Sequence, residues 1–167
     1  MSPLRRILAL TVAVGAASAC LAAPALADVA ILRSTMSGAA EVPGPGDPNA
    51  TGTSQIILDS RTGRVCYTIH VSHFSGTLTA AHIHRAPAGT AGPVVIPFRA
   101  PVGGFTAGCT IADRALVQAI IDNPSAYYTN VHSTVFPGGA ARGQLTSVIT
   151  IRTPAVGSPV PVGSARR

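Results

Sequence analysis

Hydrophobic and polar residues alternate along most of the chain, and this period of two predicts short β-strands with one buried face. The clearest example is residues 64–74, where Val65, Tyr67, Ile69 and Val71 share one face and polar residues share the other. Turn-forming segments rich in Gly, Pro, Asn and Asp separate such stretches. The predicted strands are residues 30–38, 53–59, 64–74, 76–84, 94–98, 125–136 and 141–151, with a loop over 99–110 that leaves room for a short eighth strand.

The period changes to that of an α-helix in residues 113–124. Asp113 is a candidate N-cap, and Pro124 ends the segment. The apolar stripe of this helix consists of Leu116, Ile120 and Ile121. Many short strands with a single helix are typical of an antiparallel Greek-key sandwich or barrel, so we predict an all-β domain of this type.

Residues 1–27 are typical of a secretory signal peptide. Arg5 and Arg6 form a basic start, residues 7–19 are apolar, and residues 25–27 (Ala-Leu-Ala) have the form of a cleavage site. The apolar part is too short for a convincing transmembrane span. We therefore predict that the mature chain begins at Asp28, is secreted, and has no transmembrane segment.

The cysteines fit an exported protein. Cys20 would leave with the signal peptide, although its context also weakly resembles a lipoprotein cleavage box, which is the alternative localisation. Cys66 and Cys109 remain, and in an oxidising compartment two cysteines most simply form one disulfide; two buried free thiols are the alternative. Residues 154–167 are rich in Pro, Gly, Ser and Val and predict a disordered tail, which leaves residues 28–153 as one domain.

Composition and charge argue against several functions. The 12 basic residues are all Arg, against six Asp plus Glu, for a formal net charge of +6. The Arg residues are scattered and the sequence has no Trp, so it lacks the clustered basic face that nucleic-acid binding requires. No pair of carboxylates suits general acid–base catalysis, and no G-x-S-x-G motif occurs. The sequence therefore favours a protein that is not an enzyme.

Three stretches resemble the motifs of one family. "AAHIHRAPAGTAGPVV" (80–95) and "YYTNVHSTVFPGGAARGQL" (127–145) are similar to the two main motifs of the CHRD domain, which occurs in chordin and in many secreted microbial proteins. "MSGAAEVPGP" (36–45) resembles the opening of such domains. The chain is thus identified as a member of this family, a small secreted bacterial one with a single domain.

The resemblance implies a β-barrel like that of copper/zinc superoxide dismutases, beside the immunoglobulin-like sandwich that the pattern also allows, but it implies no general activity. Ala140 and Ala141 depart from the family pattern, which has an acidic residue and a large aliphatic residue there. The positions that match the motifs but have no known role are Glu41, Asn130 and Arg142. We expect Glu41 to serve the fold, because a carboxylate in a Pro- and Gly-rich loop is most often a turn residue or an ion-pair partner, here for an Arg such as Arg142.

The five histidines include a pair one residue apart. On a strand, His82 and His84 share one face, and Asn130 and His132 share a face of another strand. If the two strands are adjacent, His82, His84 and His132 form a three-imidazole site for copper, zinc or nickel. The alternative is structural: neutral His82 and His132 would each donate a ring N–H to a backbone carbonyl and so hold a loop on a strand.

Two functional hypotheses follow. The first is a secreted, non-catalytic binding module for an unknown extracellular protein or envelope component, with no certain cofactor. The second is a copper- or zinc-binding protein that uses the H-x-H strand, with a dismutase-like redox activity as one outcome. His70 and His73 are expected to be exposed polar residues outside the site.

Overall fold

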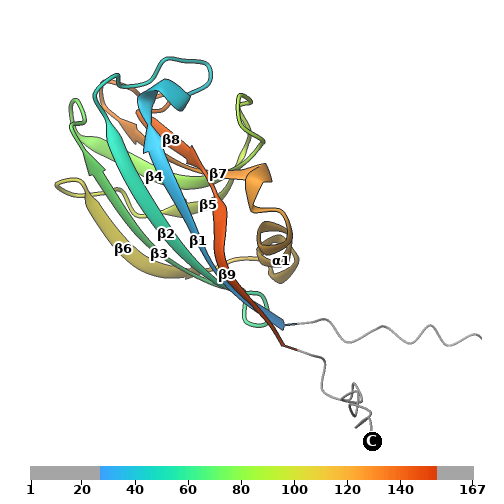
Figure 1. The fold of residues 1–167 in the computed structure, drawn as a ribbon. Coiled ribbons are helices and arrows are strands. Elements are labelled where there is room, and N and C mark those ends of the chain that lie inside the picture. The colour runs from blue at the N-terminus through green and yellow to red at the C-terminus, as the bar shows by residue number, and fades with distance from the viewer. Residues whose placement is uncertain (1–26, 154–167) are drawn as a thin grey trace, which may run out of the picture.

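The sheet dominates the fold, which a computed structural model describes for residues 27–153 (Figure 1). The predicted signal peptide, apart from its last residue, and the predicted tail lie outside the described residues. The strands are β1 (Ala27–Ser37), β2 (Thr51–Asp59), β3 (Arg64–Ser72), β4 (Leu78–Arg85), β5 (Val94–Phe98), β6 (Phe105–Ile111), β7 (Tyr127–Ser133), β8 (Ala141–Gln144) and β9 (Thr146–Thr153). The helices are η1 (Gly38–Ala40), α1 (Arg114–Asp122) and η2 (Pro124–Ala126).

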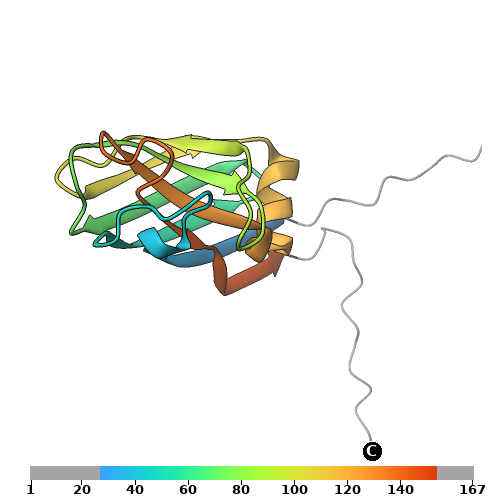
Figure 2. The ribbon, with the colours of Figure 1, turned by 90° about the horizontal axis from the view of Figure 1, so that it is seen from above.

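The strands form one antiparallel sheet in the order β5-β4-β7-β8-β1-β2-β3-β6, with β9 paired to β1. The sheet folds over into two layers and makes a nearly closed barrel, which Figure 2 shows from above. Between β3 and the edge strand β5, the Tyr67 ring stacks on Phe98 at 4.1 Å, and the Tyr67 hydroxyl accepts a hydrogen bond from the Arg99 N–H. The predicted all-β fold with one short helix is confirmed.

The alternation of the sequence produces the core. In β3, the four residues predicted to share a face are buried, and the residues between them are half-buried or exposed. The interior also contains a chain of hydroxyl groups: the Ser54 Oγ lies 2.8 Å from the Ser34 Oγ and 2.9 Å from the Thr129 Oγ1. This chain joins β1 and β2 to β7 across the barrel, so the buried hydroxyl groups satisfy one another.

Two segments differ from the prediction. The second half of the segment 99–110 belongs to a seven-residue strand, β6, which extends to Ile111 and whose small residues Ala107 and Gly108 weaken the sequence signal. Residues 141–151 form two strands, because β8 pairs with β7 whereas β9 pairs with β1, and buried Leu145 lies between them. Within the described residues, no helix is long and apolar enough to span a membrane.

The helix α1 begins as predicted. The Asp113 side chain accepts a hydrogen bond from the Leu116 N–H at 3.0 Å. The most deeply buried residues are Val117, Ile120 and Ile121, whereas the predicted Leu116 is only half-buried.

An Asp113→Ala substitution is expected to lower the free energy of unfolding by about 1 kcal/mol, because it leaves a backbone N–H of the first turn without its cap. Urea unfolding of the two proteins measures the difference. Asp113→Asn is the matched control, since Asn caps about as well as Asp, and an equal loss in both variants would contradict the capping role.

Candidate metal centre

The histidines meet because β4 and β7 are neighbours in the sheet. The antiparallel register places His82 opposite Asn130 and His84 opposite Tyr128. His132 lies two residues beyond Asn130 on β7. These five side chains therefore share the outer face of the two strands, since alternate residues of a strand point to the same side.

His82, His84 and His132 form a compact cluster. One ring nitrogen from each lies within 4.8 Å of the other two. The His82 Nδ1 and the His132 Nε2 are 3.2 Å apart. Two nitrogen ligands of a tetrahedral zinc ion, each about 2.0–2.1 Å from the metal, lie about 3.3 Å apart, so this pair already has the spacing of two ligands.

Backbone carbonyls orient two of the rings. The His84 Nδ1–H donates to the Gly92 carbonyl at 2.9 Å, and the His132 Nδ1–H donates to the Pro137 carbonyl at 3.0 Å. In a neutral imidazole the other nitrogen, Nε2, then carries the lone pair. The His84 Nε2 is buried and has no hydrogen-bond partner among the described residues. Such a carbonyl–histidine pair is the usual outer support of a metal ligand.

The chain supplies the Gly92 carbonyl through a tight turn. A Cβ at Gly92 would lie 2.0 Å from the Arg85 carbonyl oxygen, so only glycine fits where the loop 86–93 returns to β4. The Gly92 N–H also donates to the Tyr128 hydroxyl at 3.2 Å. Gly92 is thus held by two side chains, by His84 at its carbonyl and by Tyr128 at its N–H.

The environment keeps the imidazoles of His82 and His84 uncharged. Burial, together with the neighbouring His132 and His84, lowers the pKa of His82 to about 4. Burial also lowers the pKa of His84: the hydrogen bond to Gly92 acts in the opposite direction, and the neighbouring His132 and Arg142 lower this pKa further. Neutral imidazole is the form that binds a metal ion, so these two side chains are available as ligands near neutral pH.

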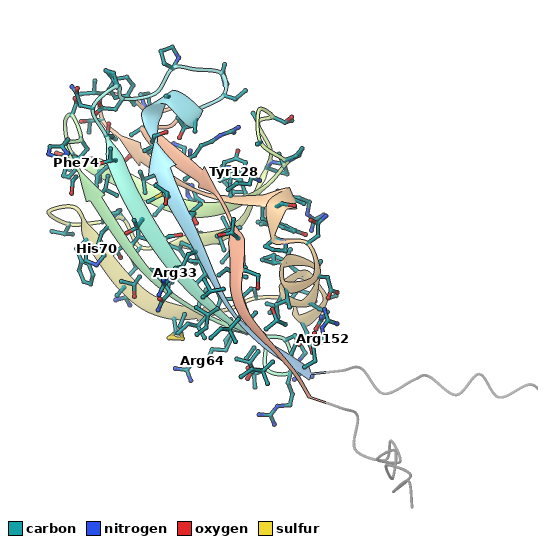
Figure 3. The ribbon with its side chains drawn as sticks, in the orientation of Figure 1. Arg33, Arg64, His70, Phe74, Tyr128 and Arg152 are labelled. Atoms are coloured by element: carbon teal, nitrogen blue, oxygen red, sulfur yellow. A yellow bond between two sulfur atoms is a disulfide. The ribbon has the colours of Figure 1, made fainter. Side chains whose placement is uncertain are left out.

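Tyr128 links this cluster to Arg142. The Tyr128 ring stacks on His84, with ring centroids 4.9 Å apart, and the Arg142 guanidinium carbon lies 4.4 Å from the centre of the same ring. Tyr128 was not among the predicted site residues, although its place two residues before Asn130 puts it on the same face of the strand. Figure 3 shows Tyr128 toward the end of the molecule away from Arg64 and Arg152.

Glu41 is a buried carboxyl group beside the cluster. Its Oε1 accepts a hydrogen bond from the Asn130 Nδ2 at 2.6 Å. Burial raises the pKa of Glu41 to about 7, although the Arg142 charge and the Val42 N–H act in the opposite direction. Of the two structural roles expected for Glu41, the ion pair with Arg142 is not formed. Within the described residues both ion pairs involve Arg152, and Arg142 instead donates to backbone carbonyls.

The remaining predicted residues lie as follows. Cys66 of β3 and Cys109 of β6 form a disulfide at directly paired positions. His70 and His73 are exposed, and His70 packs on Phe105 rather than on the cluster. Ala140, at the family's acidic position, is fully buried, and its carbonyl accepts a hydrogen bond from the Asp47 N–H.

The fold and the site together define a small β-barrel domain with a histidine cluster on its outer face. The model of one family, the CHRD domain, matches residues 32–145, which is well over half of the chain and includes the whole cluster. The chain belongs to the CHRD domain family. At the level of the family, this membership indicates a non-catalytic binding module. No curated protein and no solved structure matches the chain.

Proposed function

We propose that this chain is an exported CHRD-domain protein that binds a copper or zinc ion at His82, His84 and His132. The observation that carries the proposal is the pair of carbonyl contacts, which occupy the Nδ1 atoms of His84 and His132 and leave both Nε2 lone pairs free to act as ligands. The His84 Nε2 is buried and has no hydrogen-bond partner among residues 27–153. A purely structural histidine would need only its hydrogen bond to the loop, and the buried lone pair would then stay unsatisfied.

The donor set favours copper first and zinc second. Imidazole suits both ions, and the general order of affinity among divalent metals peaks at copper. Three imidazoles leave room for one further ligand, and a bound copper ion would supply either a docking point for that ligand or one-electron chemistry. The chain's own residues orient the rings of His84 and His132 and keep the imidazoles of His82 and His84 neutral.

Export is the second part of the proposal, with residues 1–27 as the signal peptide and the extracellular space or cell envelope as the destination. The Cys66–Cys109 disulfide supports it, because disulfides persist in oxidising compartments. The lipoprotein alternative at Cys20 would leave the mature chain attached to a membrane surface by lipid instead.

Metal content is the test. The chain is expressed with its own leader, purified without chelator or histidine tag, exposed to copper and to zinc, and assayed for bound metal. We expect near-stoichiometric metal in the wild type. Loss of one imidazole, as in His84→Ala or His132→Ala, should weaken binding about 100-fold or more, because a ligand and its oriented support are both removed.

His70→Ala and His73→Ala are matched controls, since they remove an exposed imidazole outside the cluster. They should bind as much metal as the wild type. Circular dichroism checks that each variant is folded. The proposal fails if the folded wild type takes up no metal, or if the control variants lose as much metal as the cluster variants.

A binding module for an extracellular protein or envelope component is the second candidate function. The outer face of β2, β1 and β9 carries a row of aliphatic side chains. In the register, Ile31 is paired with Ile57 on one side and Ile149 on the other, and Val29 is paired with Ile151. Of these five side chains, Ile31 is half-buried and the other four are exposed. Such an apolar patch favours a macromolecular partner, and this role needs no metal.

A further inference from the structure

A pocket of about 360 Å³ lies beside the histidine cluster. One wall is formed by η1 and the residues that follow it, and the opposite wall is formed by the loop 86–93. Its walls are mostly small apolar residues such as Ala39 and Ala88. Its polar lining comes from Glu41, Arg142 and Gln144. The pocket therefore combines an apolar lining with one permanent positive charge.

Arg142 is the feature that the proposed metal site leaves unexplained. Only 2% of this residue is exposed. Its Nε donates to the Ala40 carbonyl at 2.6 Å and its Nη1 to the Thr90 carbonyl at 3.0 Å, while the Tyr128 ring covers one face. The Nη2 makes no hydrogen bond to residues 27–153, and none of their carboxylates lies within 4.0 Å of the guanidinium.

A buried charge without a counter-charge is costly, and a guanidinium with a free N–H group is suited to an oxyanion. Glu41 lines the same pocket, but its carboxylate is not paired with Arg142, and Asn130 already occupies its Oε1. Its raised pKa, about 7, also means that near neutral pH a large share of this carboxyl group is uncharged. Within residues 27–153, the Arg142 charge is therefore compensated only in part.

We propose that this pocket is a binding site for a small oxyanion, a carboxylate or a phosphate, with the Arg142 Nη2 as the principal donor. The guanidinium is held in place before the ligand arrives, because two loop carbonyls and an aromatic ring fix it. The site does not require the metal ion, since its residues are separate from the three imidazoles.

The test is a titration of the full chain followed by ¹⁵N NMR. The protein is first passed over a chelating resin, so that neither metal nor soluble chelator is present. Sodium acetate and sodium phosphate are then added separately, with sodium chloride at matched ionic strength as the reference. We expect saturable shifts of the Arg142 Nε–H and the Gly89 amide with at least one oxyanion, and the two arms identify which class is preferred.

Two pairs of variants locate the site. Arg142→Gln should weaken binding about tenfold or more, whereas Arg33→Gln, which removes an exposed Arg bonded to Gln55, should not. Because Arg142 supports two loops, its variant can unfold. Ala88→Glu is therefore the second variant: it places a competing carboxylate at an exposed position on the pocket wall and should abolish the saturable shifts.

Ala88→Gln is the neutral match to Ala88→Glu and should retain binding. Shifts that grow with chloride as they do with the oxyanions would reflect ionic screening and would overturn the proposal. So would saturable shifts that survive unchanged in Ala88→Glu, or the absence of any saturable shift in the wild type.

Discussion

Removal of the disulfide by a Cys66→Ala, Cys109→Ala double substitution is expected to lower the free energy of unfolding by about 4 kcal/mol. The two cysteines are 43 positions apart, and closing a loop of that length restricts the unfolded chain by about this amount in the chain-entropy model. Little packing is lost, since Cys109 is exposed and Cys66 is half-buried. Urea unfolding of the wild type and the double variant, compared under oxidising conditions, measures the effect.

A reductant provides the control for this prediction. It should destabilise the wild type by a similar amount and leave the double variant unchanged. A loss below about 1 kcal/mol would mean that the unfolded chain is already compact enough for the cross-link to add little. Since β6 is the edge strand held by this bond, we expect the loss of order to begin there.

The stability of the wild type is expected to fall, relative to a Glu41→Gln variant, as the pH rises from about 4.5 to about 7. Burial raises the pKa of Glu41 from 4.5 to about 7 in the folded protein. The folded state therefore holds the proton more tightly than the unfolded state, so the contribution of Glu41 is fully present below 4.5 and is lost as the pH passes through 7. The loss should be about 2–3 kcal/mol, with allowance for solvent screening.

Glu41→Gln is the informative variant because Gln keeps an oxygen that can accept from the Asn130 Nδ2 but does not titrate. The difference in unfolding free energy between the two proteins, measured across this pH range, isolates the carboxyl group. This comparison is necessary because His82 acts in the opposite sense: its lowered pKa contributes stability above 6.5 that is lost as the pH falls through about 4. A difference that does not change with pH would show that Glu41 titrates normally.

The two proposed sites share one loop. The loop 86–93 supplies the Gly92 carbonyl to His84 and the Thr90 carbonyl to Arg142, and Tyr128 lies between those two side chains. An occupant of either site would therefore restrict the same segment. Under the two proposals together, a metal ion and an oxyanion would be bound beside the same loop.

Local patterns in the sequence determined most of the fold. Alternation predicted seven strands because a strand with one buried face must repeat every second residue, and β3 follows that pattern residue by residue. The helix start was predictable from Asp113, since a cap needs only the next few residues. The shared face of His82 and His84 also follows from the strand period alone.

Only the tertiary structure decided what those faces meet. The alternation could not identify β6, whose pairing with β3 comes from a partner strand distant in the sequence. It could not divide residues 141–151 between two neighbours, because β8 and β9 differ in their partners rather than in their composition.

The same limit applies to the candidate site. Asn130, not Arg142, is the partner of Glu41, and the two residues are 89 positions apart. The carbonyls that orient His84 and His132 belong to loops, and no side-chain pattern marks them. The sequence by itself determined which residues can act as ligands; the pairing of β4 with β7 and the path of the loops over them decided their arrangement, since contacts between distant segments depend on the whole chain being folded.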